Sequence, residues 1–145
     1  MHPRSDVNAG FSLIELAIVL TVVGLLLGFG VPAYKSMSQD QQLRATSESL
    51  AGQITFTRLR AMSTGNTQTI NFDNSTTPQR LVVLSGSAYR TWNLPRGITF
   101  VNGNAASFNM TSDGRASTSQ YVVLANNKGR RDTISVQVSG LVLVR

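Results

Sequence analysis

Hydrophobic residues fill one stretch near the start of the chain almost without interruption. From residue 11 to residue 33 the only charged side chain is Glu15. At about 1.5 Å of rise per residue, a helix of this length reaches the ~30 Å of a bilayer's hydrocarbon core. The pattern therefore predicts a membrane-spanning helix. Glu15 is its anomaly, because an ionisable group at hydrocarbon depth costs about 2.5–3.5 kcal/mol and usually has a partner or a function.

The pattern becomes amphipathic after Pro32. Apolar residues recur near helical spacing at Leu43, Leu50, Ile54 and Ala61. Charged residues occupy the other faces. We expect one long helix to about Ser63, with residues 64–66, Thr-Gly-Asn, ending it. The apolar stripe is expected to pack on the domain that follows.

From Thr67 the period of the pattern changes to two, which is typical of strands with one buried face. Glycine, proline and asparagine separate the alternating segments and predict turns. The expected strands are 69–73, 80–84, 89–92, 98–101, 107–110, 120–124, 133–138 and 141–144. The fold class is therefore α+β, in which a long amino-terminal helix packs on a small antiparallel β domain of one or two sheets.

These patterns divide the chain into four segments. We expect a polar leader at 1–10, a membrane-spanning or filament-core helix at 11–34, an amphipathic half-helix at 35–66 and a β-rich domain at 67–145. A chain of 145 residues has room for one spanning helix and one small domain.

The composition removes most enzyme chemistry. The chain has no cysteine and a single histidine, His2, which precedes the apolar segment. Disulfides, thiolate nucleophiles and histidine-dependent triads are thereby excluded from the β domain. The three aspartates of that domain, Asp73, Asp113 and Asp132, are isolated in sequence. A Lys–Ser dyad stays open, but no pairing singles one out. We expect a non-enzymatic protein with no metal and no cofactor.

The charge indicates anionic partners without choosing among them. The net charge is +6 and the sequence pI is near 10.8. Basic residues also exceed acidic ones beyond Thr67. Nucleic acid, phospholipid head groups and acidic protein surfaces would all suit such a domain.

The leader ends unusually. A secretory signal places its cleavage site after the apolar region, whereas here Gly10 stands before it. Residues 10–16, GFSLIEL, resemble the class III signal of type IV prepilins. The resemblance implies that prepilin peptidase cuts between Gly10 and Phe11 and N-methylates the new amino group of Phe11.

Cleavage between Gly10 and Phe11 would explain why Glu15 carries a charge in an apolar helix. It creates a cationic amine on Phe11 at the head of an apolar helix, and Glu15 of a neighbouring copy could neutralise it. Burying both charges as a pair costs less than burying either alone. The alternative is a plain membrane anchor whose Glu15 extends to the lipid head groups.

Small residues and a proline interrupt the apolar helix at Gly24, Gly28, Gly30 and Pro32. Each glycine weakens a helix interior by about 1 kcal/mol relative to alanine, and proline removes a hydrogen bond. The segment could therefore be soft enough to bend or melt locally when a subunit leaves the bilayer. Close packing between spanning helices explains the same residues equally well.

The outer domain is similar to the GspH/FimT family of minor pilins and pseudopilins. The likeness lies in the order of RLRA at 58–61, TINF at 69–72, WNLPRGI at 92–98, FNMTSDGR at 108–115 and ISVQVSGLVLVR at 134–145. It implies a low-abundance subunit that helps initiate or tip a type IV pilus or a type II secretion pseudopilus. Its partners would be other major and minor pilins and the inner-membrane assembly platform. It would be a single-pass protein of the bacterial inner membrane with a periplasmic domain, later part of a filament.

DNA uptake by a competence pilus is the alternative function. Some FimT-type proteins bind DNA through a G-R-x-R motif, but the equivalent segment here, 140–143, reads GLVL. Positive charge remains at Lys128, Arg130 and Arg131, in a predicted turn, and at Arg145. Such a loop could follow a phosphate backbone. The preferred interpretation is a solvated basic turn that keeps a hairpin soluble.

Overall fold

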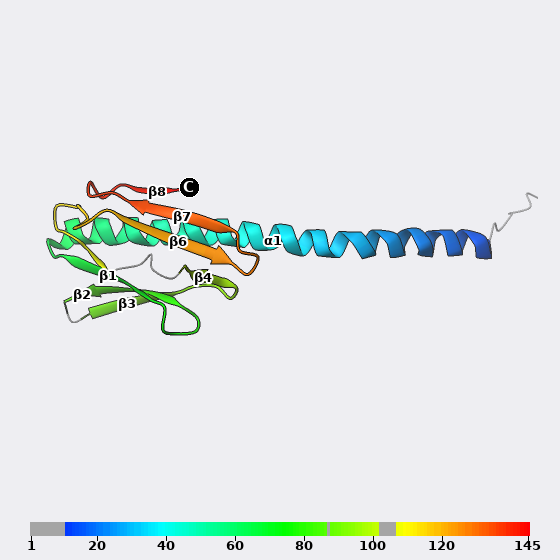
Figure 1. Cartoon of the computed structure of the whole chain (residues 1–145), viewed down its shortest axis with the longest axis horizontal. Coiled ribbons are helices and arrows are strands. Elements are labelled where there is room, and N and C mark those ends of the chain that lie inside the picture. Colours follow the sequence, from blue (N-terminus) through cyan, green and yellow to red (C-terminus); the bar gives the residue numbers. More distant parts are fainter. Residues whose placement is uncertain (1–10, 87, 102–106) are drawn as a thin grey trace, which may run out of the picture. The chain divides into compact units, whose positions relative to one another are not determined.

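A computed structural model describes residues 11–86, 88–101 and 107–145 (Figure 1). The backbone of residues 29–36, 88 and 89 is described without their side chains. The chain divides into two compact units, Met1–Ser38 and Gln39–Arg145. One helix, α1 (Leu13–Thr64), belongs in part to each unit.

Helix α1 is continuous in its backbone, including at Gly30 and Pro32. It ends where the sequence predicts. Gly65 follows Thr64 with a φ of 66°. Glycine adopts this left-handed conformation without the steric cost that a Cβ atom brings, which is why it commonly terminates helices.

Two antiparallel sheets of four strands form the β domain (Figure 1). The strand order is β3-β2-β1-β5 in the first sheet and β4-β6-β7-β8 in the second. The strands are β1 (Gln68–Asp73), β2 (Arg80–Ser85), β3 (Ala88–Asn93), β4 (Ile98–Phe100), β5 (Phe108–Met110), β6 (Gln120–Asn126), β7 (Arg131–Val136) and β8 (Val142–Val144).

The core joins α1 to both sheets. The predicted apolar stripe of the helix is buried at Leu43, Leu50, Ile54 and Ala61. The same cluster includes Ile70, Leu81 and Phe108 from the first sheet and Phe100, Val122, Leu124, Ile134 and Val136 from the second. Phe72 of the first sheet connects the two sheets, because its ring lies 5.3 Å from that of Phe100 in the second; within its own sheet it lies 6.2 Å from the ring of Phe108. The predicted α+β architecture is confirmed.

All eight predicted strands exist, but several of their boundaries were wrong. The seventh strand lies two residues earlier than expected, since Ala125 and Arg131 extend its ladder with β6. Arg131 therefore begins a strand and is not part of the turn. Residues 137–140 instead close the next turn, where the Gly140 N–H donates to the Gln137 carbonyl at 2.8 Å. Asn126, expected in a turn, ends β6 opposite Ile98.

Within the residues that the structure describes, no helix is apolar over a long enough stretch to cross a membrane.

Candidate functional site

The first turn of α1 carries a reciprocal pair of hydrogen bonds. The Glu15 N–H donates to the Ser12 hydroxyl at 3.2 Å, and the Ser12 N–H donates to Glu15 Oε2 at 3.4 Å. This is a capping box, in which a serine and a glutamate three residues later satisfy two free N–H groups of the helix start. A carboxylate is also favourable there because of the helix dipole. Glu15 thus stabilises its own helix in the single chain.

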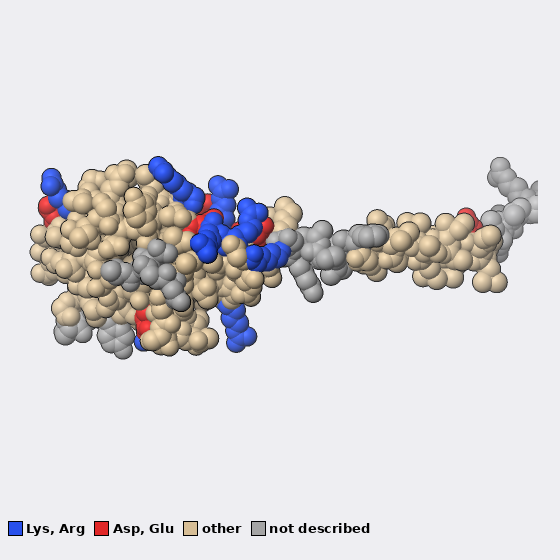
Figure 2. All heavy atoms as spheres, viewed as in Figure 1, with Lys and Arg blue, Asp and Glu red and all other residues tan. Residues whose placement is uncertain are grey.

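The helix that follows this cap exposes its apolar side chains. Every residue from 11 to 28 is exposed, including Leu13, Leu20 and Leu26. Figure 2 shows this stretch as almost uncharged surface. Extended exposed apolar surface marks a site of interaction with protein or lipid.

Gly24 and Gly28 have room around them. A Cβ atom added at either position would meet no heavy atom within 4 Å. These glycines are therefore not required by contacts within the described part of the chain. Whether they and Gly30 and Pro32 soften the helix, or admit a neighbouring helix, stays a prediction.

The turn after β6 is tied to α1 through Asp40. Arg130 Nη1 forms an ion pair with Asp40 Oδ2 at 3.1 Å, and Asn126 Nδ2 donates to Asp40 Oδ1 at 3.1 Å. Asn126 Oδ1 in turn accepts from the N–H groups of Lys128 and Arg130, each at 3.0 Å. Arg130 is therefore part of a structural network and is not a free cation.

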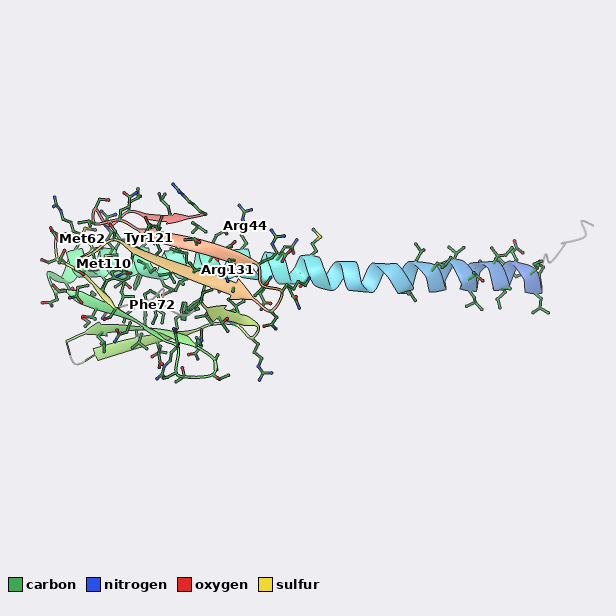
Figure 3. All side chains as sticks on the ribbon, in the orientation of Figure 1. Arg44, Met62, Phe72, Met110, Tyr121 and Arg131 are labelled. Atoms are coloured by element: carbon green, nitrogen blue, oxygen red, sulfur yellow. The ribbon has the colours of Figure 1, made fainter. Side chains whose placement is uncertain are left out.

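The other three residues predicted to contact DNA are free of ion pairs in the described part of the chain. Lys128, Arg131 and Arg145 are exposed, and none of them forms an ion pair within residues 11–86, 88–101 and 107–145. Thr133 and Arg145 exchange backbone hydrogen bonds at 2.8 and 2.9 Å. Because side chains alternate along a strand, Arg131, labelled in Figure 3, and Arg145 lie on the same face of the second sheet.

Gly140, which begins the GLVL segment, lies in a close junction. Its φ is 79°, and a Cβ atom there would come within 2.1 Å of the Gly114 carbonyl oxygen and 2.7 Å of Arg58 Nε. Arg58 Nε donates to that carbonyl at 2.9 Å. Leu141 and Leu143, at the positions where the DNA-binding motif would place arginines, are exposed. The glycine is thus explained by packing.

The aspartates of the β domain have local partners. Hydrogen bonds from Ser75 and from Arg80 lower the pKa of Asp73, and one from the Thr111 hydroxyl lowers the pKa of Asp113. Ser47 Oγ donates to Asp132 Oδ2 at 3.1 Å. Among the described side chains, no group of three or more acidic or histidine residues could hold a metal ion.

Known proteins resemble this chain both in its first residues and over a longer stretch of sequence. Residues 6–31 match the family model of the prokaryotic N-terminal methylation motif. The type IV major alpha-pilin of Moraxella bovis is 31% identical over 81 residues, which cover 55% of this chain and 50% of that pilin. The match thus spans about half the length of this curated relative.

Two kinds of solved structure share the fold. The type IV minor pilin FimU of Pseudomonas aeruginosa aligns with a TM-score of 0.62 at 15% identity, over 75% of this chain and 92% of FimU. The minor pseudopilin EpsH of the Vibrio cholerae type 2 secretion system aligns with a TM-score of 0.56 at 15% identity, over 72% of this chain and 96% of EpsH. The fold of the chain is therefore that of type IV pilin-like proteins.

Within this pilin-like chain the methylation motif contains Gly10, Phe11 and Glu15. Gly10 lies outside the described residues, so cleavage between Gly10 and Phe11 stays a prediction. The assembly role of Glu15 stays one as well.

Sequence reasoning missed two features of this site. The capping box was readable, because serine and glutamate three residues apart precede an apolar helix. The Asp40–Arg130 ion pair had no such signal, since it joins residues 90 positions apart.

Proposed function

We propose that this chain is a minor pilin or pseudopilin that helps initiate or tip a type IV pilus or a type II secretion pseudopilus. Residues 11–34 would insert in the bacterial inner membrane and hold the β domain in the periplasm. The observation that carries the proposal is the methylation motif directly in front of a pilin-like fold. The exposed apolar surface of residues 11–28 supports it, because a filament core or a bilayer would cover that surface.

Processing and assembly are linked in this proposal. Prepilin peptidase cleaves between Gly10 and Phe11 and methylates the amine of Phe11. The inner-membrane assembly platform then transfers the subunit to other major and minor pilins, where Glu15 of one subunit pairs with the amine of another. The carboxylate that caps a helix in the free subunit thereby becomes half of a buried ion pair, which costs less than an unpaired buried charge.

Two substitutions at Glu15 separate its charge from its cap. Glutamine can replace glutamate in a capping box but carries no charge, whereas alanine removes both functions. We expect Glu15→Gln and Glu15→Ala to leave membrane insertion and leader cleavage intact and to reduce incorporation equally. Immunoblots of sheared filaments and of membranes measure this. Normal incorporation of Glu15→Gln beside a defect in Glu15→Ala would show that the cap matters and would contradict the ion pair.

DNA binding is the second candidate function. It is favoured by Arg131 and Arg145, two exposed arginines that share one face of the second sheet and have no ion pair in the described ranges. Such cations can contact phosphates without reading bases. Residues 140–143 read GLVL and lack the two arginines of the G-R-x-R motif. DNA binding by this chain would therefore depend on Arg131 and Arg145 instead.

The DNA test uses the full chain in detergent. If each arginine contacts one phosphate, replacing both by glutamine should weaken duplex binding and reduce the slope of log K against log salt by about 1.8. Arg44→Gln is the matched control, because Arg44 pairs with Glu48 on the helix surface. An unchanged slope in the double variant would exclude this face, and an absence of salt-dependent binding would exclude the function.

A further inference from the structure

Strand β8 forms one edge of the second sheet. Among the described residues it pairs only with β7, and Figure 1 shows it on the side of β7 that is away from β6. The backbone of Arg145 exchanges two hydrogen bonds with that of Thr133, and the Gln137 N–H donates to the Leu141 carbonyl. Residues 141 and 145 therefore direct their backbone groups toward β7.

The backbone groups of Val142 and Val144 point the other way. In an antiparallel ladder, consecutive residues of a strand direct their N–H and C=O groups alternately to its two sides. Leu143, opposite Ser135, faces β7 like residues 141 and 145, so the two valines face outward. No backbone hydrogen bond joins them to a further strand or loop in the described ranges. Two donors and two acceptors are thus available to one added strand.

Apolar side chains accompany this free edge. Leu143 lies on the outer face of the sheet together with Ser135, whereas Val144 lies on the other face together with Ile134. Leu143 and Val144 are both exposed. Edge strands often carry lysine or proline, which oppose pairing, and residues 141–144, LVLV, contain neither. The edge therefore favours a strand that brings apolar side chains of its own.

Positive charge lies at one end of the edge. Arg145 is exposed and shares the outer face with Leu143, two residues before it. It forms no ion pair with a described residue. Asp132, the aspartate of β7, lies on the opposite face, where it accepts a hydrogen bond from Ser47 Oγ. An added strand is therefore favoured if it places a carboxylate beside Arg145.

We propose that β8 binds an extended segment of a partner protein, which adds to the second sheet as a further antiparallel strand. The partner residues opposite Val144 and Val142 exchange backbone hydrogen bonds with them. An acidic side chain lies opposite Arg145, and a large apolar one, two residues later in the partner, lies opposite Leu143. These are non-hydrogen-bonded pairs, in which cross-strand side chains come closest. The partner sequence is therefore acid-x-apolar.

A second copy of this chain does not supply such a segment. Leucine, isoleucine, valine or phenylalanine stands two residues after an acid only at Leu50 and Ile134. Leu50 is in α1, and Ile134 is in β7, which pairs on both sides. The partner is therefore a different protein, and its choice as another subunit of the filament rests on the proposed function.

A short peptide tests the binding directly. The full chain in detergent is titrated into a fluorescein-labelled, amidated peptide, GSTDVLTSG, and the anisotropy is recorded, with detergent alone as the blank. We expect a saturable rise that becomes weaker as salt is added. Replacing the peptide's aspartate by asparagine should weaken binding about two- to fivefold. Replacing its leucine by serine should weaken binding by a similar factor, about two- to fivefold.

Two variants at Val144 test the backbone contact. Val144→Pro removes the outward N–H and places its ring where the added strand would lie, so it should weaken peptide binding about tenfold or more. Val144→Thr is the matched control, because it keeps the N–H and nearly the same shape, and it should bind within about twofold of the unaltered chain. Both variants should fold, since proline is tolerated on an edge strand where its nitrogen faces outward.

A variant at Arg145 tests the charge. Arg145→Gln should weaken binding of the aspartate peptide about two- to fivefold and hardly affect the asparagine peptide. Arg96→Gln is the matched control, because Arg96 is exposed, lacks an ion pair among the described residues and precedes β4, at the other edge of the sheet. It should bind like the unaltered chain. This comparison decides the matter if Val144→Pro does not fold.

The proposal is overturned if no peptide gives a saturable rise, if a folded Val144→Pro binds as tightly as Val144→Thr, or if the aspartate and asparagine peptides bind equally. Binding of duplex DNA at Arg145 without binding of any peptide would also overturn it, in favour of the second candidate function. A chain that enters filaments but ignores the peptides contradicts the strand proposal alone. A chain that binds the peptides but never enters filaments contradicts the proposed function alone.

Discussion

The two parts of α1 have the same backbone conformation and opposite surroundings. In the unit that ends at Ser38, apolar side chains such as Leu26 are exposed, in this case by 67%. In the unit that begins at Gln39, Leu50 and Ile54 are fully buried. The second part of the helix is thus stabilised by the chain's own strands. The first part gains nothing comparable from its described surroundings, and its apolar side chains stay exposed there.

The largest expected effect tests this difference directly. Leu50→Ala should lower the free energy of unfolding by about 2–5 kcal/mol, because it leaves a cavity in the core. Leu26→Ala removes the same atoms from an exposed position and should change it by less than about 0.5 kcal/mol. Denaturant unfolding of the full chain in detergent, followed by Trp92 fluorescence, measures both. Equal losses would contradict the contrast between the two parts.

A second pair compares two glycines of the β-domain unit, one that ends α1 and one in the turn between β7 and β8. Gly65 and Gly140 both have positive φ, but only Gly140 faces nearby atoms, the Gly114 carbonyl oxygen and Arg58 Nε. Gly65→Ala should cost about 1–2 kcal/mol through backbone strain alone. Gly140→Ala should cost about 1–3 kcal/mol more, because the added methyl overpacks the junction. Denaturant midpoints compare them. Similar midpoints would mean that the junction relaxes without cost.

Two serines give a smaller pair. Ser47→Ala, in the buried part, removes the hydrogen bond to the half-buried Asp132 and should destabilise the β domain by about 0.5–1.5 kcal/mol. Ser12→Ala removes the cap and should cost about 1 kcal/mol in the first turn only. It should speed amide hydrogen exchange there while the domain's denaturation midpoint stays unchanged. A shift of that midpoint by Ser12→Ala would show that the two parts unfold together.

The smallest effect is a pH dependence confined to the β domain. Hydrogen bonds from Ser75 and Arg80 lower the pKa of Asp73 below its usual 3.8. A lowered pKa in the folded state gives stability that is present above the unfolded value and is lost as pH falls through the folded one. Asp73→Asn should therefore be slightly less stable than the unaltered chain at neutral pH and equal to it in strong acid. Midpoints across that range test this, and a constant difference would contradict it.

Local sequence patterns predicted which residues face the core. Helical spacing marked Leu50 and Ile54 as facing the following domain, and both are fully buried. These signals work because burial of one face imposes the period of the element on the sequence.

Strand pairing could not be predicted in this way. In the structure β1 lies between β2 and β5, and β4 pairs with β6. The hydrophobic pattern of a strand does not indicate which other strand it pairs with. Boundaries failed for the same reason, since Asn126 belongs to β6 through its pairing with Ile98. The ion pair of Arg130 could not be predicted either, because its partner, Asp40, is on the helix. The position of β8 at an edge likewise follows from the pairing of the strands and not from its own sequence.

The Asp40 network also has a mechanical consequence. Asp40 is the second residue of its unit and holds both Arg130 and Asn126, and Ser47 contacts Asp132 two turns further along the helix. Tension applied to α1 ahead of Gln39 would therefore reach the domain first at these contacts. Since the helix runs alongside β6 and β7 (Figure 1), the load acts in shear and several contacts must break together. The force needed to separate α1 from the sheets should therefore be larger when α1 is pulled along its axis than when it is pulled perpendicular to that axis.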